Sequence, residues 1–220
     1  MTAGTTRAAP LWDVPVRAFH WLLIALIAFS WWSGENHEME WHRTSGYAIL
    51  ALVVFRLFWG LAGGRTARFA RFVRGPRAVI AYVRGGAGAA PGHNPLGGWS
   101  VVAMLATVAA MVTAGLFAVD VDGLESGPLA DYVTFDQGRM AAQWHGVIFN
   151  LLLALIALHV AAVLVYLVRG RNLIGAMIHG RRAVAEGEAV EPLGASWWRA
   201  LVGVVIAGAV AWAVSRGFRF

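Results

Sequence analysis

Cysteine and lysine are both absent from this chain of 220 residues. Without a thiol, the protein has no disulfide, no thiolate ligand for zinc or an iron–sulfur cluster, and no attachment site for covalent haem. Without lysine, it has neither Schiff-base chemistry nor a lysine nucleophile. Any bound cofactor must therefore be held by other side chains.

Charged residues are scarce as well. They make up 14% of the chain, whereas 59% of the residues are hydrophobic. Soluble domains usually carry about 25% charged and roughly 45–50% apolar residues, so the composition excludes an ordinary soluble domain. All 18 basic residues are arginines, and the formal net charge is +6. In a membrane protein such an excess marks one face of the membrane, and we expect no nucleic-acid partner.

Five apolar runs have close to the ~17–25 residues that a helix needs to cross a bilayer. They are Val16–Trp32, Thr44–Leu61, Gly98–Val119, Trp144–Val168 and Trp197–Val214. Their apolar residues do not alternate with polar ones, as they would in membrane strands. We predict an all-α integral membrane bundle, with a four-helix core in residues 1–180 and a cytoplasmic linker plus a fifth span in residues 181–220.

The arginines predict the orientation. Six of them lie between the second and third runs, where there is no acidic residue: Arg65, Arg68, Arg71, Arg74, Arg77 and Arg84. The loops after the first and third runs are acidic instead. By the positive-inside rule the basic loops and the N-terminus are cytoplasmic, and the acidic loops then face outward, to a periplasm if the host is Gram-negative. Arg216 and Arg219 depart from this rule, because they follow the fifth span on the outer side.

Four histidines lie within or beside the predicted spans, where ionisable residues are rare and usually functional. His145 and His159 are 14 residues apart, which is about 21 Å along one helix and nearly the same helix face. Given the alternating direction of the spans, His20 lies at the depth of His159 and His42 at that of His145. The pairs that can meet are therefore His20 with His159 (inner) and His42 with His145 (outer).

Two facing histidines at each of two depths are what two b-type haems with bis-histidine ligation require. Gly46 and Gly146 leave space near the backbone for a flat macrocycle. Arg56 lies 14 residues after His42 on the same stripe, towards the cytoplasmic end, and is a candidate partner for a propionate of the inner haem. Arg17 is a second candidate, although either arginine could equally extend to the lipid headgroups.

Two other functions are compatible with these spans and histidines. A membrane metal-binding or transport protein could employ these histidines, although they lie at two depths and the spans contain no carboxylate. A passive membrane anchor of an oxidoreductase complex would leave the histidine spacing unexplained.

Several segments resemble the bacterial cytochrome b561 family, whose superfamily includes the b-type cytochrome subunit of nickel–iron hydrogenases. They are Val14–Trp21, Trp41–Tyr47, Phe55–Gly60, Trp144-His145 with Asn150 and Leu158-His159, Gly92–Gly97 and Asn172–Met177. The resemblance covers about Leu11 to Ile178. It implies a four-helix core with two b haems on His20, His42, His145 and His159.

The resemblance also implies partners. Members of the family move electrons between quinone in the membrane and a periplasmic c-type cytochrome, a hydrogenase or another dehydrogenase. His93, in a loop before the third span, is a candidate to handle a proton or a quinone carbonyl near the inner haem, or else to cap the helix entry. A minimal member of the family has four helices and lacks the fifth span. Gly203 and Gly208 on this span would allow close packing in a homodimer or on a partner helix.

Overall fold

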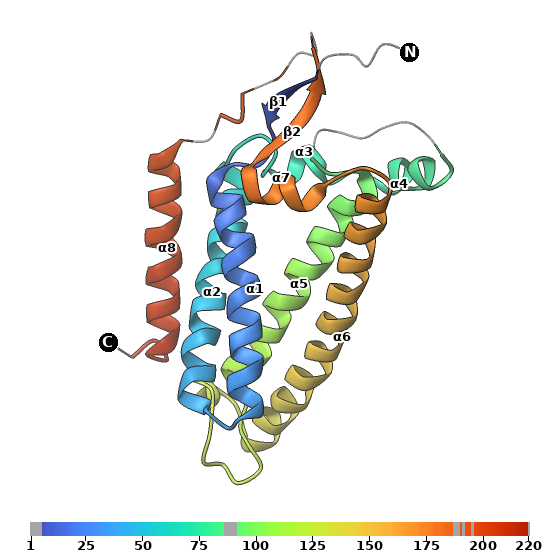
Figure 1. Ribbon diagram of the computed structural model, residues 1–220. Helices are drawn as coiled ribbons and strands as arrows, with labels where there is room; N and C mark the ends of the chain where they lie inside the picture. The colour runs from blue at the N-terminus through green and yellow to red at the C-terminus, as the bar shows by residue number, and fades with distance from the viewer. Residues whose placement is uncertain (1–5, 86–91, 187–189, 191, 195, 220) are drawn as a thin grey trace.

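The computed structural model describes residues 6–85, 92–186, 190, 192–194 and 196–219. Five of its helices are long and apolar enough to cross a membrane (Figure 1). They are α1 (Val14–Glu35), α2 (Met39–Ala62), α5 (Pro95–Phe117), α6 (Phe135–Val168) and α8 (Trp197–Ser215). The predicted all-α membrane bundle with a fifth spanning helix is confirmed.

Several of the helices begin at a side-chain cap. Asp13 accepts a hydrogen bond from the Val16 N–H and begins α1. Asn94 accepts from the Gly97 N–H at 2.6 Å and begins α5. The same Asn-x-x-Gly arrangement recurs where Asn172 begins α7 (Leu173–His179). Two of the segments behind the family resemblance are therefore helix N-caps, which satisfy backbone donors that the first turn leaves free.

Helix α6 begins nine residues before the predicted span, because Thr134 and Gln137 form a reciprocal capping box that extends the helix from its N-terminus. Its 34 residues correspond to about 51 Å, more than the ~30 Å hydrocarbon core. The first turns of α6 therefore project beyond the apolar layer.

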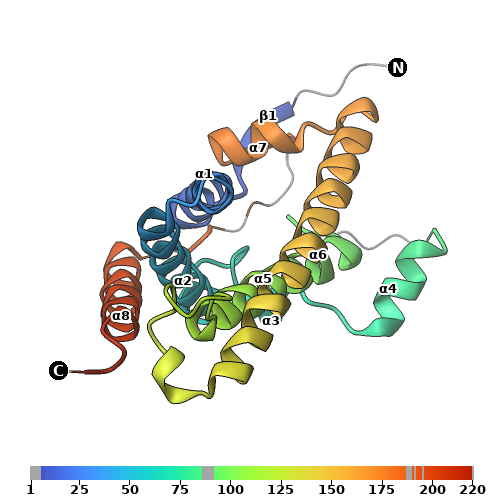
Figure 2. The same cartoon turned by 90° about the horizontal axis from the view of Figure 1, so that it is seen from below.

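The spanning helices form two pairs, in which α1 packs against α2 and α5 against α6. Helix α2 also contacts α5 and joins the pairs, while α8 lies on the outer side of α2 (Figures 1 and 2). Gly203 makes the α8 contact possible, since a Cβ there would lie 2.7 Å from the Phe58 ring. The fifth span thus packs within its own chain through one of the two predicted glycines. An added Cβ at the other, Gly208, meets nothing within 4 Å.

We call the end that carries the N-terminal strand and residues 63–85, 92–94 and 169–186 the basic end. It holds the short helices α3 (Phe69–Phe72) and α4 (Pro76–Val83), and α7. It also holds a sheet that we did not predict, in which β1 (Thr6–Pro10) pairs antiparallel with β2 (Arg181–Ala185). This ladder joins segments from both sides of the predicted division at residue 180, and that division stays a prediction.

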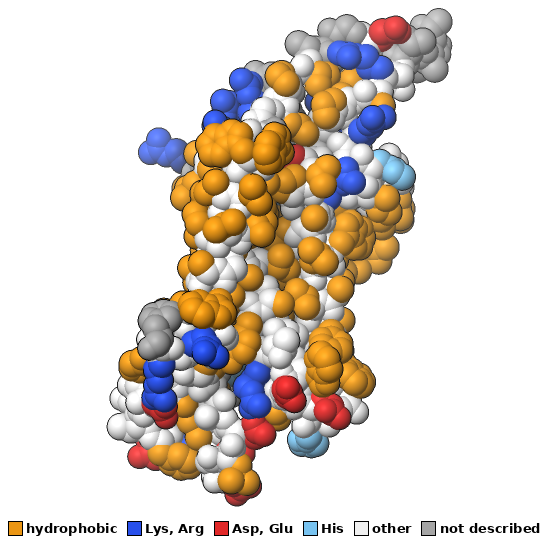
Figure 3. Space-filling model, turned by 90° about the vertical axis from the view of Figure 1, so that its left-hand side faces the viewer, with side chains coloured by type: hydrophobic (Ala, Val, Ile, Leu, Met, Phe, Trp, Pro, Cys, Tyr) orange, Lys and Arg blue, Asp and Glu red, His pale blue; other side chains and the backbone are white. Residues whose placement is uncertain are grey.

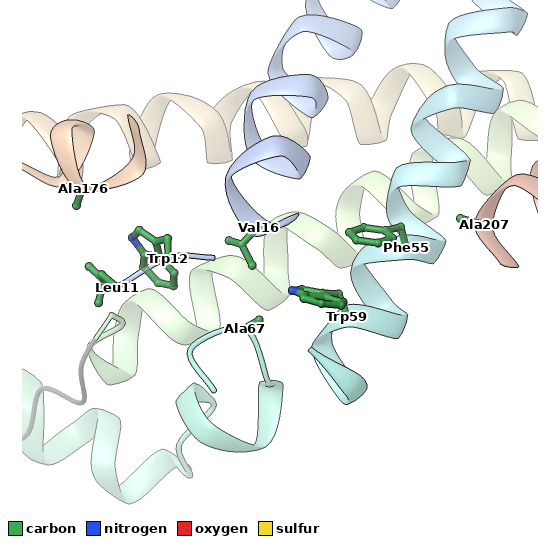
Figure 4. Packing of buried hydrophobic residues seen from close by; sticks show 8 residues of the cluster. All are labelled: Leu11, Trp12, Val16, Phe55, Trp59, Ala67, Ala176 and Ala207. Carbon is green, nitrogen blue, oxygen red and sulfur yellow. The ribbon is translucent and has the colours of Figure 1, made fainter. Parts of the chain in front are cut away.

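A buried cluster fastens the basic end to the bundle. Trp59 of α2 donates its indole N–H to Asp13 at 3.0 Å and stacks on Phe55. The remaining members of the cluster come from the N-terminal segment, α1, the loop before α3, α7 and α8: Leu11, Trp12, Val16, Ala67, Ala176 and Ala207 (Figure 4). Segments from both termini therefore share one core at this end.

The opposite end, with residues 36–38 and 118–134, is the acidic end. The 3-10 helix η1 (Ala130–Tyr132) lies here and anchors the segment that follows α8. Tyr132 donates its hydroxyl to the Gly217 carbonyl at 2.8 Å, and Arg219 forms an ion pair with Asp131 at 2.5 Å. Figure 3 shows, on the α8 side, an apolar band between charged groups gathered at the two ends.

Candidate functional site

His42 and His145 face each other at the acidic end, with ring centroids 5.9 Å apart. Each ring is held by the partner helix of its own pair. Nδ1 of His42 lies 2.8 Å from the carbonyl oxygen of Ser30 on α1, and Nδ1 of His145 lies 2.8 Å from that of Met111 on α5. Since a carbonyl only accepts, each Nδ1 carries the hydrogen, and each Nε2 keeps a lone pair for a metal ion.

A cavity of about 260 Å³ adjoins this histidine pair. Its walls come from all four core helices and include Gly46, Gly146 and Arg43. An added Cβ at Gly46 or Gly146 would meet nothing within 4 Å, so both glycines border open space. Arg43 also forms an ion pair with Glu125 of the loop between α5 and α6.

His20 and His159 form the second pair, nearer the basic end, with centroids 6.5 Å apart. When two imidazoles bind one metal ion, each metal–nitrogen bond is about 2 Å long and each ring centroid lies roughly 1 Å beyond its nitrogen, so the centroids are about 6 Å apart. Both pairs therefore have room for one iron. Nδ1 of His20 is buried without a hydrogen-bond partner among the described residues.

Arg56 is buried near the basic end, with 4% of its surface exposed. Its guanidinium lies over the Phe69 ring at 4.7 Å, and its Nη1 has no hydrogen-bond partner in the described part of the chain. Asp13 is close enough to interact electrostatically with it. Burial raises the pKa of Asp13, while hydrogen bonds from Val16 and Trp59 and the charge of Arg56 act in the opposite direction. An unpartnered buried guanidinium nitrogen is a donor available to an anion.

Arg17 and His93 also lie near this end. The Arg17 guanidinium lies beside Gly180, where an added Cβ would be 2.6 Å from Nη1. His93 lies between Trp12 and Phe72, with ring centroids 4.8 and 4.6 Å away. Burial lowers the pKa of His93 to about 4, with further lowering from Arg56 and His159. His93 is therefore neutral at pH 7, and its buried Nδ1 has no described partner.

Sequence reasoning missed two features of the site. The first is the pair of backbone carbonyls that orient His42 and His145. A glycine four residues after each carbonyl, Gly34 and Gly115, was the available signal. The second is a polar cluster at the basic end, in which Asn94 donates to the hydroxyls of Tyr82 and Tyr166 at 3.0 and 2.6 Å. The aromatic spacing gave no indication of this cluster.

The described residues contain no group of three or more histidine, aspartate and glutamate side chains arranged to hold a metal ion. The histidines of the spans meet instead in two separate pairs, within a bundle of membrane-spanning helices. These features define a class of membrane protein that can hold a flat, metal-centred cofactor between helices.

The model of the prokaryotic cytochrome b561 family matches residues 11–180, which is well over half of the chain. The chain belongs to this family. It is therefore a multi-pass bacterial membrane protein that binds b-type haem and transfers electrons. Comparisons with curated proteins and with solved structures gave no match.

Proposed function

We propose that the protein is a dihaem cytochrome b that carries electrons across the bacterial inner membrane, between the quinone pool and a redox partner. The observation behind this proposal is the meeting of four histidines in two pairs at two depths. In the proposal, His42 and His145 ligate an outer haem, and His20 and His159 ligate an inner haem. A haem held by two histidines would have no coordination site left for oxygen, so it would supply electron transfer and not oxygen activation.

The two pairs divide the path through the membrane. His145 and His159 lie on one helix, about 21 Å apart along its axis. The separation replaces one crossing of the whole apolar layer by shorter steps. The helices hold the imidazoles in place, which keeps the groups that must exchange electrons in fixed positions.

Polar groups near the inner pair support further assignments. We assign Arg56 to a propionate of the inner haem, because its buried Nη1 lacks a partner among the residues that the structure describes and a carboxylate would supply one. Arg17 is a second propionate partner. We place a quinone near the inner haem, within reach of His93. Nδ1 of this neutral ring has no partner among the described residues and could donate its N–H to a quinone carbonyl.

The orientation follows from the charges at the two ends. We place the basic end in the cytoplasm and the acidic end in the periplasm. Arg219 departs from the positive-inside rule in this orientation, but its charge is paired with that of Asp131. The redox partner at the outer haem is then a periplasmic c-type cytochrome, or a hydrogenase or other dehydrogenase subunit.

Haem content tests the proposal directly. The purified full-length protein should give two haems per chain by the pyridine haemochrome assay and a b-type spectrum after reduction with dithionite. One haem per chain would contradict the pair assignment, and a haem-free preparation from haem-sufficient cells would contradict the proposed function.

The orientation needs a separate test, for which the absence of cysteine is convenient. Single cysteines at Gly75 and Asp122 place one thiol at each end of the bundle. An impermeant maleimide added to intact spheroplasts should label Asp122→Cys and spare Gly75→Cys. The reverse pattern would invert the proposed topology.

A further inference from the structure

The outer ligands are anchored in a way that His20 of the inner pair is not. His42 and His145 each donate Nδ1–H to a carbonyl of the neighbouring helix, both at 2.8 Å. The Ser30 carbonyl also accepts from the Ser33 hydroxyl, and the Ser30 hydroxyl lies 3.3 Å from the same His42 nitrogen. Nδ1 of His20, by contrast, is buried without a described partner.

Both anchors depend on a missing side chain. Gly34 and Gly115 lie four residues after the accepting carbonyls of Ser30 and Met111. In a helix this position flanks the carbonyl, so a side chain there would stand between the oxygen and a neighbouring helix. A Cβ at Gly34 would lie 3.1 Å from Nδ1 of His42, and one at Gly115 would lie 3.0 Å from Nδ1 of His145.

These distances are a few tenths of an ångström shorter than an ordinary contact between a methyl group and an imidazole. Alanine at either position would push the ring away by a few tenths of an ångström and lengthen the hydrogen bond to the carbonyl. Both glycines are in helices whose backbone an alanine adopts readily, so the requirement at these positions is for space and not for an unusual backbone angle.

We propose that Gly34 and Gly115 are positioning residues for the outer haem: they admit the carbonyl–imidazole hydrogen bonds that orient both ligands and raise their basicity. This inference rests on the proposed function, since it assumes a haem on His42 and His145. A more basic imidazole stabilises the oxidised iron more than the reduced iron. The two hydrogen bonds therefore lower the midpoint potential of the outer haem.

The test compares Gly34→Ala and Gly115→Ala with Gly208→Ala in the purified, haem-loaded, full-length protein. Gly208 is a matched control, because its Cβ would meet nothing within 4 Å and it lies on α8, outside the four-helix core. Redox titration followed optically should show an upward shift for the outer haem in the first two variants. The inner haem should be unchanged in all three.

Ser30→Ala separates the two hydrogen-bond acceptors near His42. It removes the hydroxyl at 3.3 Å and keeps the carbonyl at 2.8 Å, so it should shift the potential less than Gly34→Ala. The electron paramagnetic resonance of the ferric low-spin outer haem should change in the glycine variants too, since the imidazole planes turn.

Pulsed electron paramagnetic resonance of the unsubstituted protein gives a second measurement, should an alanine variant fail to bind the outer haem. The quadrupole coupling of the remote imidazole nitrogen falls when its N–H is hydrogen-bonded. It should be smaller for the outer ligands than for His20.

Each outcome bears on one proposal. Two haems in every variant with an unshifted outer potential would overturn the role of the glycines, as would equal remote-nitrogen couplings at the two haems. Absence of haem from the unsubstituted protein would instead overturn the proposed function.

Discussion

The two histidine pairs have the same residue types but different surroundings. At the acidic end, both imidazoles are hydrogen-bonded to helix carbonyls beside an open cavity. Towards the basic end, Nδ1 of His20 has no such bond within the described part of the chain, and buried Arg56 lies in the same region with a nitrogen that has no described partner. Carbonyl bonds favour the oxidised iron, whereas a nearby positive charge favours the reduced iron. One scaffold thus gives its two ends opposite electrostatic character.

Removal of one ligand from each pair gives the largest expected effect. His145→Ala should lose the outer haem and keep the inner one, and His159→Ala should do the reverse, because each iron would lose an axial bond. The pyridine haemochrome assay should fall from two haems per chain to one in both variants. If either variant kept both haems, the assignment of ligands to pairs would be wrong.

Acid should destabilise the basic end through His93. Its pKa is about 4 in the folded protein and 6.5 in the unfolded chain, so the unfolded chain binds the proton first. Stability is then lost as the pH falls from 6.5 towards 4, by on the order of 3 kcal/mol at most. His93→Gln should reduce this dependence, measured as the difference in thermal midpoint between pH 7 and pH 5 in detergent.

The comparison with His93→Gln is needed because Asp13 works in the opposite direction. Its raised pKa contributes stability at low pH that is lost as the pH rises. An identical pH dependence in the variant and the unsubstituted protein would show that His93 is not the group responsible.

Replacement of Arg56 should narrow the difference between the haems. Arg56→Gln removes a buried positive charge, which should make reduction of the inner haem less favourable by about 1–2 kcal/mol. For one electron, this energy lowers the midpoint potential by roughly 40–90 mV. Redox titration of the His145→Ala background isolates this haem. Arg17→Gln is the control and should shift it less, because Arg17 is only half-buried. A larger shift for Arg17→Gln than for Arg56→Gln would make Arg17, and not Arg56, the main propionate partner.

The ion pair at the acidic end should have the smallest effect. Arg219 and Asp131 are each 71% exposed, so Asp131→Asn should change the free energy of unfolding by less than about 1 kcal/mol. Both haem potentials should stay constant, which distinguishes this contact from those near the histidines. The change in thermal midpoint caused by Asp131→Asn should be measured at low and at high salt. If this change were the same at both salt concentrations, the contribution of the contact would not be ionic.

The depth of a residue could be predicted from the sequence, because it depends only on helix rise and on the direction of each span. This is why His20 was expected near His159, and why the structure brings them to 6.5 Å. Lateral contacts could not be predicted in this way. The carbonyls facing His42 and His145, and the packing of Gly203 against Phe58, depend on how neighbouring helices are rotated.

The β1–β2 sheet was missed for a related reason. Its two strands have only five residues each and are separated by nearly the whole membrane domain. Short arginine- and alanine-containing segments such as Arg181–Ala185 carry no alternation that would mark a strand. Pairing between them is decided by where α1 begins and α7 ends, and the N–H groups of Leu11 and Trp12 complete it through the Gly180 carbonyl.

That sheet also sets an order of events during synthesis. Thr6–Pro10 leaves the ribosome well before Arg181–Ala185, and at roughly 5–20 residues per second the first strand waits about 9 to 35 s for its partner. Helices α1 and α2 can already associate in that interval, while the cover over the basic end is still incomplete. Closure of this end is therefore a late step of folding, which follows the synthesis of α1, α2 and α6, the helices that carry the two histidine pairs.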